Sequence, residues 1–244
     1  MEFTEFSEKI EKAFLDLIGL KLNEKQTQAF FEYMNLLIEK NKVMNLTAIN
    51  DPDEIIVKHF VDSSILSKFY SEEFFKSKKL IDVGTGAGFP GIPLAIIYPD
   101  SKFVLTDTLG KRINFLSDVL EKIKLKNVEL IKARAEDLAH DPKHREKFDI
   151  CLSRGVAKIS VLSEYSLPFV KEKGAMLAYK MDNCVEELDE GSNAIKVLGG
   201  MFHVKHTYTL NPEEPKRCIL QINKIKSTPK TYPRKAGTPS KAPL

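Results

Sequence analysis

The chain has 244 residues, of which 43% are hydrophobic and 29% charged, which is enough for one core of ordinary size with an appended subdomain. Three scattered cysteines argue against a disulfide framework or a zinc site, and no apolar run approaches membrane-spanning length. The acidic start, Met1–Glu5, lacks the basic and apolar regions of a signal peptide. We therefore expect reduced thiols, no membrane contact and a cytoplasmic location.

The net charge of +3 is unevenly distributed along the chain. Residues 226–244 carry five cations and no acid, so the rest of the chain sums to −2. Residues 1–78 hold 10 lysines against 14 acidic residues and sum to −4. A polyanion such as RNA should therefore contact the tail, for example Tyr232, Arg234 and Lys235. With four prolines and no apolar periodicity, this tail is expected to be disordered or loosely docked, and its removal should leave ligand binding by the sheet intact.

Residues 1–78 predict an N-terminal helical subdomain. An apolar stripe over 3–17 indicates the first helix. Asn23 and Gln26 have the spacing of a capping box that opens a second helix. Asp51 and Pro52 are suited to cap and begin a third helix, whose stripe includes His59.

Residues 79–225 alternate between strand and helix patterns, which predicts an α/β domain with a doubly wound, mostly parallel sheet. The final two strands, separated by a short turn, predict a β-hairpin that closes a seven-stranded sheet of the methyltransferase plan, and residues 226–244 form a separate basic tail. The expected strands are 79–83, 102–106, 128–132, 148–153, 175–180, 203–210 and 217–225. The expected helices are 90–98, 111–124, 158–170 and 183–197.

The stretch Leu80–Gly91 combines an apolar strand, the acid Asp82, glycines at 84, 86 and 88, and a helix. Such a loop at the carboxyl end of a strand is a typical nucleotide-binding element. A dinucleotide fingerprint requires a third glycine where Phe89 stands, and the Lys and Ser or Thr of a phosphate-binding loop are missing. A cationic, phosphate-free ligand such as S-adenosylmethionine (AdoMet) suits Asp82 better.

Three further strand ends carry candidate site residues. Asp107, 23 residues after Gly84, is placed to accept two ribose hydroxyls, which favours an adenosine ligand without choosing between NAD and AdoMet. Residues 134–137 border the expected adenine position, although an acidic first helical turn would look the same. Arg154 is expected to bind either the carboxylate of the cofactor or an RNA phosphate.

Several motifs together resemble one known family: Met44–Thr47, His59–Ser63, Asp82–Pro93, Ser153–Ala157 and Tyr232–Arg234. In this order they resemble the glucose-inhibited division protein B family, the bacterial small-subunit rRNA guanine-N7 methyltransferases called RsmG. The resemblance covers nearly the whole chain. It implies a class I (Rossmann-like) methyltransferase sheet with an N-terminal helical cap, AdoMet as cofactor, and methylation of N7 of one guanine in 16S rRNA.

The same resemblance implies cofactor contacts at Gly84, Phe89, Ala135, Glu136 and Arg154. The glycine loop and the strand end themselves add Gly86 and Asp107. No metal site is expected. We expect the protein to act as a monomer on 16S rRNA or on the small ribosomal subunit.

Guanine N7 carries a lone pair and no proton, so this reaction needs no general base. Asn45, His59 and Asp62 are candidates for the guanine pocket, while a hydrogen-bonded helix pair and a turn residue are equally good interpretations. The rival functions are a nicotinamide-dependent oxidoreductase and a non-enzymatic RNA-binding assembly factor.

Overall fold

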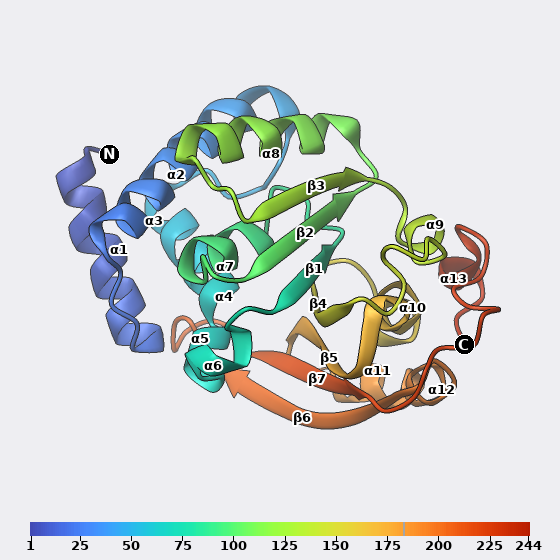
Figure 1. Cartoon of the computed structure of the whole chain (residues 1–244). Coiled ribbons are helices and arrows are strands. Elements are labelled where there is room, and N and C mark those ends of the chain that lie inside the picture. The colour runs from blue at the N-terminus through green and yellow to red at the C-terminus, as the bar shows by residue number, and fades with distance from the viewer. Residues whose placement is uncertain (183) are drawn as a thin grey trace.

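In a computed structural model that describes residues 1–182 and 184–244, a single mixed sheet organises the chain (Figure 1). Within the described residues this sheet has seven strands in the order β3-β2-β1-β4-β5-β7-β6. Strands β1 to β5 are parallel, and β7 runs antiparallel to both β5 and β6. The strands are β1 (Lys79–Val83), β2 (Lys102–Asp107), β3 (Val128–Lys132), β4 (Phe148–Arg154), β5 (Val170–Met181), β6 (Gly200–Tyr208) and β7 (Arg217–Lys224).

This order confirms the predicted doubly wound sheet with a closing hairpin. The chain starts in the middle with β1, moves outward through β2 and β3, and crosses back to β4 on the other side of β1. The carboxyl ends of β1 and β4 therefore lie side by side, since Ile81 is paired with Cys151 and Asp82 with Leu152. Ligands bind at such a switch point in open α/β sheets.

Helices cover both faces of the sheet (Figure 1). One side carries α7 (Gly91–Ile97) and α8 (Gly110–Ile123), and the other carries the helices that follow β3, β4 and β5. The latter are α9 (Ala135–Leu138), α10 (Ile159–Ser166), α11 (Val185–Glu190) and α12 (Ser192–Val197). The expected helix over 158–170 ends early, because a 3₁₀ turn at Leu167–Phe169 leads directly into a β5 longer than predicted. The first residue of the helix expected at 183–197, Asn183, lies outside the described residues.

The N-terminal region is helical, as predicted, and its caps are those expected. Asn23 and Gln26 form a reciprocal capping box, and Asp51 accepts a hydrogen bond from the backbone of Glu54. The helices are α1 (Phe3–Ile18), α2 (Glu24–Met44), α3 (Pro52–Ile55), α4 (Asp62–Ser64), α5 (Leu66–Phe69) and α6 (Glu72–Phe75). Between α3 and α4 the chain widens into a π-helical turn, Ile56–Val61, which carries His59; such turns are frequent at functional sites.

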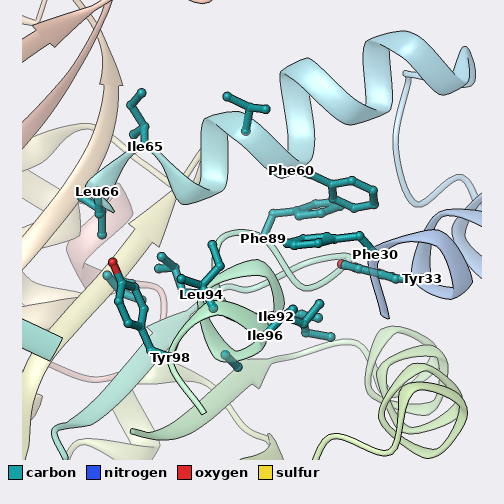
Figure 2. Packing of buried hydrophobic residues seen from close by; sticks show 14 of the residues in the cluster. Phe30, Tyr33, Phe60, Ile65, Leu66, Phe89, Ile92, Leu94, Ile96 and Tyr98 are labelled. Carbon is teal, nitrogen blue, oxygen red and sulfur yellow. The ribbon is translucent and has the colours of Figure 1, made fainter. Parts of the chain in front are cut away.

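Aromatic rings join these helices to the sheet (Figure 2). Phe30 and Tyr33 of α2 pack against Phe60 of the π-helical turn, with ring centroids 5.0 and 5.4 Å apart. Tyr33 also stacks on Phe89 of the glycine loop at 5.5 Å. Since burying one such ring contributes about 1.5–3 kcal/mol, this cluster positions the π-helical turn against the carboxyl edge of the sheet.

The C-terminal segment differs from the sequence-based expectation. Residues 226–244 pack beside α9 and α10 and end in a short helix, α13 (Thr238–Lys241) (Figure 1). Thr228, Pro233 and Pro239 are buried. The prediction of a disordered or loosely docked tail is therefore wrong, because specific polar anchors replace the apolar stripe that the sequence lacks.

In the described part of the chain, no helix is long and apolar enough to cross a membrane.

Candidate functional site

The glycine loop lies at the carboxyl end of β1 and is fixed to β2. The amides of Gly84 and Thr85 both donate to the carbonyl of Thr106, each at 3.0 Å. Gly84 and Gly86 have φ of 71° and 62°, in the left-handed region that favours glycine. A Cβ at Gly84 would lie 2.8 Å from Cγ2 of Val156, so the loop also needs glycine there for close approach.

Asp82 braces this loop from inside. Its Oδ2 accepts hydrogen bonds from the Thr85 hydroxyl (2.7 Å) and the Gly91 amide (2.9 Å), and the residue is 1% exposed. Burial raises its pKa to about 6, although both hydrogen bonds lower it. Asp82 thus braces the loop through Oδ2, and its suitability for a cationic ligand stays a prediction.

Asp107 ends β2 at a cavity of about 380 Å³, which we call the loop cavity. Its Oδ1 accepts the Leu109 amide at 2.9 Å, and its Oδ2 accepts the Gly86 amide and Nη1 of Arg112, both at 3.1 Å. These contacts fix the carboxylate at the strand end, as the sequence predicts for a group that binds vicinal hydroxyls. The loop cavity is lined by Val83, Gly84, Thr106–Thr108, Arg112, Ala133–Glu136, Gly155, Val156, Tyr165, Gly237 and Ser240.

The structure thus brings four predicted residues, Gly84, Asp107, Ala135 and Glu136, to one cavity. Residues 134–137, which the sequence places beside the adenine, form the turn into α9, and this helix begins at Ala135. Gly86 contributes through its hydrogen bond to Asp107. Sequence reasoning missed the lining residues Tyr165, Gly237 and Ser240, which are far from the loop in sequence and belong to no motif around it.

Arg154 ends β4 and faces a second cavity, of about 570 Å³. This basic cavity is lined by five cations against two acids, with two tyrosines between them. The lining residues are Ile49, Lys58, His59, Asp62, Arg154–Lys158, Tyr179–Met181, Glu187, Tyr208 and Arg217. Of these cations, only Arg154 was a sequence-based candidate; Lys58, Lys180 and Arg217 come from separate elements and carry no local signal.

Asp62 holds the guanidinium groups of this cavity in place. Its Oδ2 lies 2.7 Å from Nη1 of Arg154 and 3.3 Å from Nη1 of Arg217, and its Oδ1 accepts the Tyr208 hydroxyl at 2.8 Å. The residue is 2% exposed. Burial, and then the Asp62 charge, raise the pKa of Tyr208, which therefore stays a hydrogen-bond donor. Asp62 is thus an anchor whose two oxygens are both in use.

His59 lies between Arg154 and the glycine loop. Its ring stacks on Phe89 at 4.5 Å, Nδ1 accepts from Nη2 of Arg154 at 3.3 Å, and Nε2 lies 2.8 Å from the Thr47 hydroxyl. Burial, followed by the charge of Arg154, lowers the pKa of His59 to about 3. The imidazole is therefore neutral, with Nε2 donating to Thr47.

Phe89 and Asn45 occupy supporting positions. Phe89 is buried, and its ring lies 5.0 Å below the guanidinium carbon of Arg154, so it supports that side chain from the loop. Asn45 is exposed at the C-terminal end of α2, with a left-handed φ of 50°. Among the described residues, Asn45 lines neither cavity. Its position is that of a residue that forms the turn after α2.

The two cavities meet at Gly155 and Val156, which line both. The two cavities are therefore adjacent. Among residues 1–182 and 184–244, no cluster of three or more His, Cys, Asp or Glu side chains could hold a metal ion.

Comparisons with known proteins agree with this arrangement. The profile of the GidB family, described as rRNA small subunit methyltransferase G, matches residues 26–214. The ribosomal RNA small subunit methyltransferase G of Clostridium perfringens strain SM101 is 48% identical over 94% of this chain and 95% of its own. That of Lachnoclostridium phytofermentans is 47% identical over 93% of both chains.

Solved structures of lower similarity share the fold. TYW2 from M. jannaschii, in complex with AdoMet, has a TM-score of 0.50 at 16% identity, covering 63% of this chain and 73% of its own. The YcgJ protein from Bacillus subtilis has a TM-score of 0.51 at 15% identity, covering 69% and 100%. The sheet is that of the class I methyltransferases. On the matched profile and the relatives of nearly half identical sequence, the chain belongs to the GidB family of rRNA small subunit methyltransferases G.

Proposed function

We propose that this protein transfers a methyl group from AdoMet to N7 of a specific guanine in 16S rRNA. The observation that carries the proposal is the junction at Gly155 and Val156. On one side lies a cavity built from a glycine loop and a strand-end acid, and on the other a basic cavity with tyrosines. This pairing suits an adenosine cofactor and an RNA nucleotide, which must meet at the methyl group.

AdoMet fits the loop cavity by its chemistry. Asp107 accepts the two ribose hydroxyls, and the turn at Ala135 and Glu136 borders the adenine. The methionine end then runs past Gly84 towards Arg154, whose guanidinium binds the carboxylate of the cofactor or a phosphate of the RNA. The glycine loop offers no side-chain cation for a pyrophosphate, which favours AdoMet over NAD.

The basic cavity suits a nucleotide taken out of its stack. Lys58, Lys180 and Arg217 supply positive charge for phosphates, and Tyr179 and Tyr208 supply aromatic rings beside them. We further propose that the protein acts as a monomer. We place this activity in the cytoplasm, where the small ribosomal subunit is found.

The chemistry requires positioning rather than proton transfer. The N7 lone pair attacks the methyl carbon, the bond from carbon to sulfur breaks, and the positive charge moves from the sulfonium to the guanine. His59 is neutral and hydrogen-bonded to Arg154 and Thr47, and both oxygens of Asp62 are in use. Neither group is placed as a general base, and none is needed, because orientation and electrostatics carry this reaction.

The test is methyl transfer from labelled AdoMet to small-subunit RNA, offered as naked RNA and as the 30S particle. Reduction followed by aniline treatment cleaves RNA at N7-methylguanine and maps the product to one nucleotide. A single cleavage site that depends on the protein is the expected result. Label at another base atom would overturn the N7 assignment. RNA binding without label transfer would instead identify a non-enzymatic assembly factor, and a melting temperature raised by NAD but not AdoMet would favour the oxidoreductase.

A further inference from the structure

The C-terminal segment, residues 226–244, is fixed to the rest of the protein by a buried charge at the end of β7. The ammonium of Lys224 is fully buried and donates to the carbonyl of Leu167 and the hydroxyl of Thr228, both at 2.6 Å. It also pairs with Glu146 at 3.1 Å, and Glu146 accepts the Thr228 amide at 2.7 Å. A buried ammonium with three partners sets the direction in which the segment leaves the sheet.

Arg145 provides the second attachment. Its guanidinium donates to the carbonyls of Thr228, Pro229 and Tyr232, at distances of 2.8 to 3.1 Å. Three carbonyls bound by one side chain fix the shape of the turn between residues 228 and 232. The segment is therefore held by its backbone, which explains how a sequence rich in proline and lysine packs without an apolar stripe.

The third attachment is a two-pronged ion pair between Arg234 and Glu164 of α10. Nη2 and Nε of Arg234 lie 2.7 and 3.0 Å from Oε2 and Oε1 of Glu164, and the Arg234 amide donates to Oε1 at 2.6 Å. Glu164 is fully buried, so its carboxylate depends on this arginine for its neutralisation. Arg234 is thus a partly exposed residue whose guanidinium is paired with a buried acid, and the phosphate contact expected from the sequence stays a prediction.

The segment then reaches the loop cavity. The Gly237 amide donates to Oε1 of Glu136 at 2.9 Å, and Gly237 and Ser240 both line the cavity that contains Asp107. Glu136 is buried, so its carboxylate is oriented by a residue 101 positions later in the chain. The side of the cavity beyond Asp107, next to the turn that follows β3, is therefore completed by the C-terminus.

We propose that residues 237–240 form the adenine-side wall of the AdoMet pocket, and that Arg234 is a positioning residue that holds this wall through Glu164. The proposal rests on the proposed function, because it takes AdoMet as the ligand of the loop cavity. With the ribose on Asp107, the base extends towards Glu136 and meets Gly237 and Ser240. This wall excludes water from one side of the base and fixes the Glu136 carboxylate beside its polar edge. Loss of the segment should then weaken AdoMet binding, contrary to the sequence-based expectation.

The experiment compares Arg234→Ala, Arg234→Lys and Lys235→Ala in the full-length protein. Lys235→Ala is the matched control, since it removes one cation from the neighbouring, exposed position. Calorimetry at 20 °C measures the Kd of AdoMet and of 5′-methylthioadenosine, which lacks the amino-acid end. Thermal melting of the ligand-free proteins is recorded in parallel. A protein that remains folded at 20 °C binds with an affinity set by its pocket, so a stability defect alone leaves both Kd values unchanged.

We expect Arg234→Ala to raise both Kd values about tenfold. A change of this size corresponds to the loss of about one charge-assisted hydrogen bond. Arg234→Lys should recover part of this loss, and Lys235→Ala should bind both ligands as the parent protein does. If Arg234→Ala lowers the melting temperature but leaves both Kd values unchanged, the proposal that this segment forms a wall of the pocket is wrong. The proposed function is then unaffected. Failure of the parent protein to bind AdoMet would instead overturn the proposed function.

If Arg234→Ala does not fold, Gly237→Ala provides the same test. Gly237 has a φ of 81°, and a Cβ there meets no atom within 4 Å among the described residues. The substitution therefore strains the backbone locally and displaces the amide that binds Glu136, without a new clash. A Kd for 5′-methylthioadenosine raised several-fold, by about the cost of one hydrogen bond, supports the wall, and an unchanged value contradicts it.

Discussion

The loop cavity and the basic cavity lie side by side but are built in different ways. In the loop cavity, short consecutive stretches supply most of the groups: the glycine turn, Asp107 and the turn at Ala135. In the basic cavity, Lys58, Arg154 and Arg217 come from the π-helical turn, β4 and β7, and one buried acid, Asp62, binds both arginines. The first site is therefore held by backbone geometry, and the second by a network of side-chain charges that depends on the whole fold.

The largest effect is expected where the charge network is broken. Asp62→Ala leaves two guanidinium groups without their shared carboxylate and Tyr208 without its acceptor. We expect a loss of about 4 kcal/mol in the free energy of unfolding, measured by urea denaturation. Asp62→Asn, which retains an acceptor for Tyr208, should lose less. A loss below about 1 kcal/mol for Asp62→Ala would show that the basic cavity does not depend on this acid.

A second, slightly smaller effect is the pH dependence of stability that Asp82 gives the glycine loop. In the folded protein Asp82 has a pKa of about 6, against an ordinary value of 3.8. Between these values the folded state binds more protons than the unfolded chain, so this group lowers stability as pH rises, by about 3 kcal/mol over the window. The stability that the protonated Asp82 contributes is therefore fully present below pH 3.8 and is lost as pH rises through 6.

Asp82→Asn removes this titration. Relative to the parent protein, the variant should gain about 2.5 kcal/mol in unfolding free energy between pH 4 and pH 7, as measured by urea denaturation. Asp100→Asn, at an exposed position, serves as the control for general changes in net charge. A difference between variant and parent that is constant across this range would mean that Asp82 is ionised in the fold throughout.

The smallest effect compares two glycines of the loop. Gly84→Ala must both strain a φ of 71° and displace Val156, whereas Gly86→Ala strains a φ of 62° and meets no described atom within 4 Å. We expect losses of about 2 and about 1 kcal/mol in unfolding free energy, respectively. Thermal and urea denaturation of the two variants measure the difference. Equal losses would show that Val156 moves freely at the junction of the cavities.

These differences explain how much could be predicted from sequence. The parallel strands, the glycine loop, the capping box at Asn23 and the acid at Asp107 depend on residues close together in the chain, and periodicity or spacing reveals them. The pairs Arg234–Glu164 and Arg217–Asp62 join residues 70 or more positions apart. No local pattern records such a pair, so the tail was expected to be disordered and the basic cavity was mostly missed. The burial of Asp82 was not foreseen for the same reason, since it depends on packing around the loop.

The central claim is that the loop cavity holds AdoMet and the basic cavity holds the target nucleotide. A crossed measurement tests it most directly: the AdoMet Kd by calorimetry, and the KM for 30S particles in methyl transfer, for Asp107→Asn and Arg217→Ala. We predict that Asp107→Asn raises the AdoMet Kd at least about tenfold through weakened ribose hydrogen bonds. Arg217→Ala should raise the KM for the particle while leaving the AdoMet Kd unchanged. An Arg217→Ala variant that binds AdoMet weakly but has a normal KM for the particle would contradict the assignment of the two cavities.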